Sequence, residues 1–134
     1  MTRICLDANV LVAAFASRGL CSDLLRLVLS EYDLIIPEVV VEELRRTLTT
    51  KLEVASLASV EAILDRCEIV PEGSEPCPIE DRDPDDARVL ADALTGRVDL
   101  LVTGDQDLLS VAAESPIPIL SPRAFMALAR GGLR

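Results

Sequence analysis

Along the chain, short runs of apolar residues alternate with longer segments in which apolar residues recur at helical spacing. The short runs predict strands at residues 3–6, 34–36, 68–70, 98–102 and 117–120. The longer segments predict helices at residues 9–16, 20–30, 38–48, 56–65, 84–94 and 122–129, with a further short helix that ends at residue 109. The alternation predicts the α/β class: a three-layer α/β/α fold with a central, mostly parallel sheet of about four or five strands.

The helix at residues 84–94 has the clearest local signals. Asp83 can cap it, and Pro84 suits the first helical position. Asp85 and Asp86 complement the positive end of the helix, and Gly96 ends it. The helix follows the stretch PEGSEPCPIEDRDP, whose prolines and acidic residues predict a loop.

Composition narrows the picture. Half of the 134 residues are hydrophobic but only 2% are aromatic, so aliphatic side chains must form the core. The length and the lack of repeats predict a single domain that spans residues 1–134. The net charge of −10 argues against a protein that coats nucleic acid, which needs a basic stripe. It allows an enzyme whose acidic residues hold metal ions, because a bound divalent cation reverses the local charge.

The first residues, MTRICLDANVLVAAFASRG, combine an early arginine with an apolar run, as an export signal does. Asp7 and Asn9 interrupt that run, so we interpret it as a buried strand that delivers both residues to a site. No uninterrupted apolar run reaches the roughly 18 residues of a membrane-spanning helix, so no membrane association is expected.

The four cysteines form no CxxC pair, and the chain has no histidine. This composition argues against a zinc site and against a Cys/His catalytic pair. Reduced thiols in the cytoplasm are the simplest interpretation, although a bond between Cys67 and Cys77 stays open as an alternative.

Acidic residues follow two predicted strands. Asp7 comes after the first strand, and Asp105 comes after the strand at residues 98–102. Ligands of open parallel sheets bind outside the carboxyl ends of the strands, so both side chains are expected at one edge. Asp86, in the first turn of its helix, is expected near that edge as well.

The helix at residues 38–48 offers two acids, Glu42 and Glu43. At 100° per residue, its apolar stripe consists of Val40, Val41, Leu44 and Leu48. Glu43 projects onto the shoulder of this stripe, whereas Glu42 projects almost opposite its centre. We therefore predict that Glu42 faces solvent and that Glu43 points partly inward, where a charge needs a partner.

Each acid also has an ordinary structural interpretation. Asp86 could serve the helix dipole, and Asp105 could cap a short helix. Glu43 could pair with Arg46 or Thr47. Their convergence on one edge favours a functional site, because crowded carboxylates repel one another unless cations are present. Oxygen ligands of this kind favour Mg²⁺ or Mn²⁺ over zinc.

Four motifs, in order along the chain, are DANV, EELRRTL, DPDDARVLADAL and LVTGDQDLL. Together they resemble the PIN domain, and more narrowly the small PIN-family toxins of prokaryotic toxin–antitoxin modules. The resemblance extends from Ile4 to the closing SPRAFMAL segment. Each motif is weak alone, but their order and spacing in a chain of this length are specific.

The resemblance implies a metal-dependent endoribonuclease that leaves a 5′-phosphate and a 3′-hydroxyl. By position, Asp7, Glu43, Asp86 and Asp105 match the family's four catalytic, metal-binding acids. The auxiliary positions of the family match Asn9, Thr103 and Asp107. The resemblance further implies Mg²⁺ or Mn²⁺ as cofactor, RNA as substrate, a cognate antitoxin protein as partner, and a homodimer.

Two positions depart from the family. Ala8 stands where the family usually has Thr or Ser, and Pro37 stands where Ser is common. Neither departure changes an acid of the quartet. For substrate contact we expect Arg18, on the hinge after the first helix; the other candidates are Arg45, Arg46 and Arg82.

Three other functions compete with this interpretation. A haloacid-dehalogenase-type phosphatase needs a second Asp where this chain has Asn9, and a phosphoacceptor receiver needs a late lysine, whereas the one lysine is Lys51. A non-catalytic or RNA-processing PIN module that acts through protein partners is the remaining alternative. Loss of one acid of the quartet would favour it, and none is lost.

Overall fold

The protein is built on one parallel sheet. The structure, a computed structural model, describes residues 2–50, 54–79 and 83–132. Its strands are β1 (Arg3–Leu6), β2 (Asp33–Pro37), β3 (Glu68–Val70), β4 (Leu100–Val102) and β5 (Ile119–Leu120). They lie in the order β3-β2-β1-β4-β5, and every neighbouring pair is parallel. This confirms the predicted α/β class and the upper of the two predicted strand numbers.

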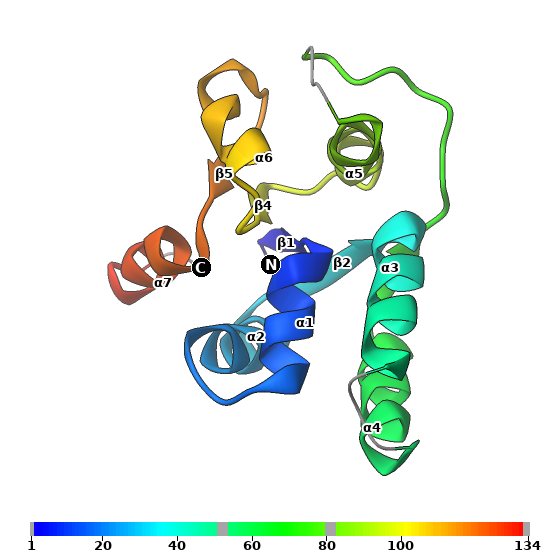
Figure 1. The fold of residues 1–134 in the computed structure, drawn as a ribbon. Helices are drawn as coiled ribbons and strands as arrows, with labels where there is room; N and C mark the ends of the chain where they lie inside the picture. The colour runs from blue at the N-terminus through cyan, green and yellow to red at the C-terminus, as the bar shows by residue number, and fades with distance from the viewer. Residues whose placement is uncertain (1, 51–53, 80–82, 133–134) are drawn as a thin grey trace.

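Helices cover both faces of the sheet. They are α1 (Ala8–Ala16), α2 (Leu20–Glu31), α3 (Glu38–Thr49), α4 (Val54–Leu64), α5 (Pro84–Thr95), α6 (Gln106–Ser110) and α7 (Pro122–Arg130), with a short 3₁₀ turn at Ala112–Glu114. The chain steps in one direction from β1 to β3 and then back to β4, so right-handed crossovers put α5 on the face opposite α1 and α2. Figure 1 shows this three-layer arrangement.

The core consists mainly of aliphatic side chains, as the composition requires. β1, at the centre of the sheet, contributes Ile4, Cys5 and Leu6, all fully buried. The few aromatic residues add one contact, in which the rings of Tyr32 and Phe125 pack edge to face with centroids 5.8 Å apart. This contact joins the end of α2 to α7.

The predicted strand at residues 98–102 starts two residues later than expected. The backbone N–H of Val98 donates to the carbonyl of Ala93, 3.1 Å away, and so closes the end of α5 instead of joining the sheet. Strand pairing to β1 begins at Leu100. The sequence pattern missed this because apolar residues that end a helix and apolar residues in a buried strand look alike.

Gly96 lets α5 end against the sheet. A Cβ atom at this position would lie 2.6 Å from Cγ2 of Val70 and 3.3 Å from Cγ2 of Ile35. We predict that Gly96→Ala lowers the free energy of unfolding by about 1–3 kcal/mol, because the added methyl overpacks the core. Urea denaturation measures this. Gly131→Ala, at the end of α7, is the matched control and should cost less; an equal loss for both variants would contradict the overpacking argument.

No helix in the described part of the chain is both long and apolar enough to cross a bilayer. All four cysteines are free thiols, so the alternative bond between Cys67 and Cys77 is not formed in this structure.

Candidate active site

The strands β1 and β4 are neighbours, and their carboxyl ends carry Asp7 and Asp105. The backbone N–H of Asp7 donates to the carbonyl of Val102 over 2.9 Å, which holds Asp7 beside the end of β4. A cavity of about 360 Å³ opens at this edge. Its lining includes all four acids of the predicted quartet: Asp7, Glu43, Asp86 and Asp105.

Asp7 is the most enclosed acid of the cavity, with 4% of its surface exposed. Its Oδ2 atom accepts hydrogen bonds from Thr103 Oγ1 at 2.7 Å and from Asn9 Nδ2 at 3.2 Å, and its Oδ1 atom accepts from the N–H of Ala8 at 2.8 Å. Thr103 and Asn9, predicted as auxiliary residues, therefore orient this carboxylate directly.

The surroundings also alter the acidity of Asp7. Burial raises the pKa of Asp7 above its usual value, because the charged form loses contact with water. The hydrogen bond from Thr103 opposes the increase, and the nearby charge of Asp105 adds to it. A cation bound beside the carboxylate would offset the cost of keeping it ionised.

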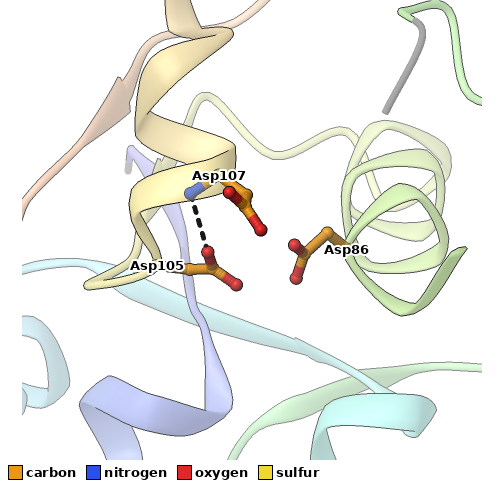
Figure 2. Close-up of side chains that lie close together, drawn as sticks. All are labelled: Asp86, Asp105 and Asp107. Atoms are coloured by element: carbon orange, nitrogen blue, oxygen red, sulfur yellow. Dashed lines mark hydrogen bonds between the residues drawn. The ribbon is translucent and has the colours of Figure 1, made fainter. Parts of the chain in front are cut away.

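Asp86, Asp105 and Asp107 form a compact group across the cavity (Figure 2). Each offers one carboxylate oxygen such that all three atoms lie within 4.8 Å of one another. Asp105 also caps α6, since its Oδ1 accepts from the N–H of Asp107 at 2.8 Å. The structural role and the functional role of Asp105 are thus compatible, and Asp107 belongs to the cluster.

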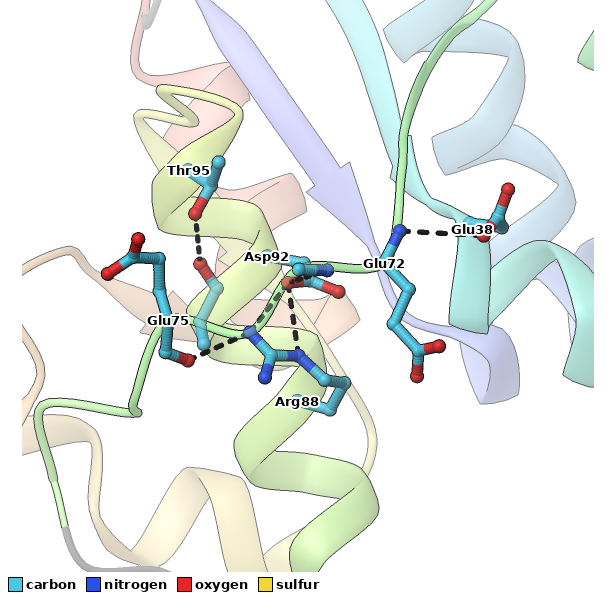
Figure 3. A network of polar contacts seen from close by, with 8 residues as sticks. Glu38, Glu72, Glu75, Arg88, Asp92 and Thr95 are labelled. Atoms are coloured by element: carbon cyan, nitrogen blue, oxygen red, sulfur yellow. Dashed lines mark hydrogen bonds and ion pairs between the residues drawn. The ribbon is translucent and has the colours of Figure 1, made fainter.

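A polar network holds the middle of α5 (Figure 3), the helix whose first turn carries Asp86. The Oδ1 atom of the fully buried Asp92 accepts from Arg88 Nη2 at 2.7 Å and from the N–H of Gly73 at 3.2 Å. Arg88 also donates to the carbonyl of Glu75 at 2.9 Å. This network ties the segment after β3 to the helix that supplies the acids.

Glu42 and Glu43 of α3 both border the cavity, and both are exposed. Partial burial raises the pKa of Glu43, the charge of Asp7 raises it further, and Arg46 opposes the increase. The Glu43 carboxylate therefore interacts with the charge of the innermost acid, but Glu43 is exposed, whereas the helical projection predicts a side chain that points partly inward. The contrast with Glu42 is smaller than the projection predicts, because a long side chain at the cavity mouth reaches it from a wider range of angles.

Comparison with known proteins decides the family. A family profile described as PIN domain matches residues 3–107, which include all four acids of the quartet. The chain belongs to the PIN domain family. No curated protein sequence matches it significantly.

Three solved structures with similar folds are VapBC complexes. The VapBC2 structure from Rickettsia felis, bound to a DNA fragment from its promoter, matches with a TM-score of 0.63 and 19% identity over 89% of this chain and 97% of the other. DNA-bound VapBC from Salmonella typhimurium gives 0.61 and 18% over 91% and 99%. VapBC-1 from nontypeable Haemophilus influenzae gives 0.63 and 14% over 91% and 99%. At such identities the likeness shows that this PIN domain shares their fold.

The four arginines predicted as candidates for substrate contact differ in how near they lie to the acids of this PIN domain. Arg18 is exposed beyond the far end of the nine-residue α1, about 13 Å along the helix from Asp7, and is not among the described residues that line the cavity. Arg45 pairs with Glu61 of α4 at 2.7 Å. Arg46 does line the cavity. Arg82 lies outside the described residues.

The two departures from the family pattern lie at the start of α1, which follows Asp7, and at the start of α3, which carries Glu43. Ala8 is buried, and only its backbone N–H contacts Asp7. Pro37 precedes α3 and provides no side-chain cap. The site therefore lacks two hydroxyl groups, while the contacts of Asp7 with Thr103 and Asn9 are intact.

The raised pKa of Asp7 predicts a pH dependence of stability in the metal-free PIN domain. A carboxyl whose pKa is higher in the folded protein stabilises it at low pH, and this contribution is lost as the pH rises through the folded pKa. Asn cannot titrate, so the stability of Asp7→Asn relative to the wild type should rise as the pH increases from about 4, the ordinary pKa of Asp, through the raised pKa of Asp7 in the folded protein. Urea denaturation of both proteins in EDTA measures the difference, and a constant difference would contradict the prediction.

Proposed function

We propose that this PIN domain is a metal-dependent endoribonuclease in which Asp7, Glu43, Asp86 and Asp105 are the catalytic, metal-binding acids. The observation that carries the proposal is the convergence of these acids, from four separate elements, on one cavity. The oxygens of Asp86, Asp105 and Asp107, within 4.8 Å of one another, support it further.

The donor set fits a hard divalent cation. The lining residues offer carboxylate oxygens, and the chain has no histidine, so Mg²⁺ or Mn²⁺ suits the site better than a softer metal. Asp7, Glu43, Asp86 and Asp105 would hold the ion or ions, with Asp107 as an auxiliary ligand. Bound divalent ions in nucleases activate a water molecule and stabilise the charge that develops on the attacked phosphate.

The residues around the acids orient them before any substrate arrives. Thr103 and Asn9 donate to the same oxygen of Asp7, so its carboxylate cannot rotate freely. The N–H of Asp105 donates to Thr103 Oγ1 at 3.0 Å, so one hydroxyl links the acids that follow β1 and β4. Such partners typically change metal affinity or activity by about 10–100-fold when they are removed.

Cleavage of RNA in the presence of Mg²⁺ or Mn²⁺ tests the proposal. We expect activity that is lost in EDTA and is restored by an excess of either ion, with products that carry a 5′-phosphate and a 3′-hydroxyl. Equal cleavage in EDTA would overturn the metal-dependent mechanism. RNA binding without cleavage would instead favour the alternative, a non-catalytic or RNA-processing PIN module.

We further propose that this nuclease is the toxin of a toxin–antitoxin pair and acts in the cytoplasm on cellular RNA. The similar VapBC structures support a protein partner, and a homodimer is proposed on the family resemblance alone. Growth arrest on expression, relieved by a small protein encoded next to this gene, is the expected result. Arg18 stays a proposed contact for parts of the RNA away from the attacked phosphate.

A further inference from the structure

The lining of the acidic cavity is unbalanced in charge. Seven carboxylates border it, those of Asp7, Glu42, Glu43, Asp83, Asp85, Asp86 and Asp105. Among the described residues that line it, the one basic side chain is Arg46. Any carboxylate of this cavity that a cation does not neutralise repels an RNA phosphate. Arg46 is the lining residue whose positive charge can attract that phosphate.

The guanidinium of Arg46 is available for a ligand. Its neighbour Arg45 is held by Glu61 through two hydrogen bonds of 2.7 and 2.9 Å. Arg46, in contrast, makes no hydrogen bond or ion pair with the described part of the chain and is exposed. A planar guanidinium with unused donors can bind two oxygens of one phosphate at once.

The charge of Arg46 also acts on one of the proposed metal-binding acids, Glu43. It follows Glu43 by three residues, so both side chains lie on the same side of α3. The charge of Arg46 acts on the Glu43 carboxylate, which in turn is coupled to Asp7. A phosphate bound by Arg46 would therefore lie beside the proposed metal-binding acids.

We propose that Arg46 binds a backbone phosphate of single-stranded RNA at the mouth of the acidic cavity, through paired N–H donors to two non-bridging oxygens. This inference rests on the proposed nuclease function. It assigns the phosphate contact nearest the acids to α3, which also carries Glu43, and leaves the hinge after α1 to more distant parts of the RNA.

The test compares Arg46→Ala, Arg46→Lys and Arg45→Ala with the wild type. KM for a short RNA is measured with Mg²⁺, and the dissociation constant of the same RNA is measured by fluorescence anisotropy with Ca²⁺, each at several salt concentrations. We expect Arg46→Ala to weaken binding about 10-fold and to reduce the slope of log affinity against log salt by about 0.7, the value for one single-strand phosphate contact. Arg46→Lys should restore the slope but only part of the affinity, because an ammonium lacks the paired donors.

Arg45→Ala is the matched control, since it removes the same charge from the adjacent position of α3. It should leave both the affinity and the salt slope close to those of the wild type. The inference is overturned if Arg46→Ala binds RNA as the wild type does, or if Arg45→Ala has an equal effect, or if the wild type binds no RNA. A wild type that binds RNA in an Arg46-dependent way but does not cleave it would contradict the proposed function alone.

Discussion

Asp7→Asn is expected to lower RNA cleavage by roughly 10³-fold, the largest effect of any single substitution in this protein. The change replaces a charged oxygen ligand with a neutral amide at the most enclosed position of the cavity. A loss of about 4 kcal/mol of transition-state stabilisation corresponds to this factor, and it is a reasonable magnitude when a metal ion beside the reacting phosphate loses a charged ligand that positions it. Single-turnover cleavage at saturating Mn²⁺ measures the chemical step.

The same variant should remain folded. The amide of Asn has nearly the shape of the carboxylate and carries no charge. Burial of the charged carboxylate is unfavourable, as the raised pKa of Asp7 indicates, and the substitution removes this cost. We therefore expect the metal-free Tm to be equal or higher, while the increase in Tm caused by Mn²⁺ becomes smaller. Asp33→Asn, at the start of β2 on the opposite edge of the sheet, is the control and should keep full activity. Activity above about a tenth of the wild type in Asp7→Asn would contradict the assignment.

The sequence pattern predicts which edge of the sheet carries the site more completely than it predicts the contacts among the residues of the site. Asp7 and Asp105 follow apolar strands, and the rule for parallel sheets brings both to one edge whatever the strand order. Their direct adjacency depends on β4 lying next to β1, which is a long-range pairing that local periodicity does not encode. The hydrogen bond between Thr103 and Asp7, 96 residues apart, follows from that pairing.

Side chains with two plausible environments are harder to predict. Asp92, which the sequence pattern does not single out, is fully buried, and it accepts hydrogen bonds from Arg88, one turn earlier, and from the backbone of Gly73. Arg18 lies on the hinge after α1, as predicted, but α1 begins beside Asp7 and ends at this hinge, so the contact with RNA that we propose for Arg18 is away from the attacked phosphate. In both cases the outcome depends on where a distant loop or helix end lies.

The pair Glu43→Gln and Glu42→Gln tests the choice between two adjacent glutamates of α3 that both border the cavity. We expect Glu43→Gln to lower cleavage about 10²-fold, because the loss of a charged ligand weakens metal binding. A higher Mn²⁺ concentration should therefore restore part of the activity. Glu42→Gln should stay within about two-fold of the wild type, since Glu42 projects almost opposite the apolar stripe of α3, away from Asp7.

The two variants make the same chemical change at adjacent exposed positions of α3, so effects on helix stability and on net charge cancel in the comparison. The coupling of Glu43 to Asp7 is the structural reason to expect a difference. If Glu42→Gln is the inactive variant, the phase argument is wrong and Glu42 takes the place of Glu43 in the quartet. If both variants lose activity equally, the total negative charge at the mouth of the cavity matters for cleavage, and neither glutamate is a specific metal ligand.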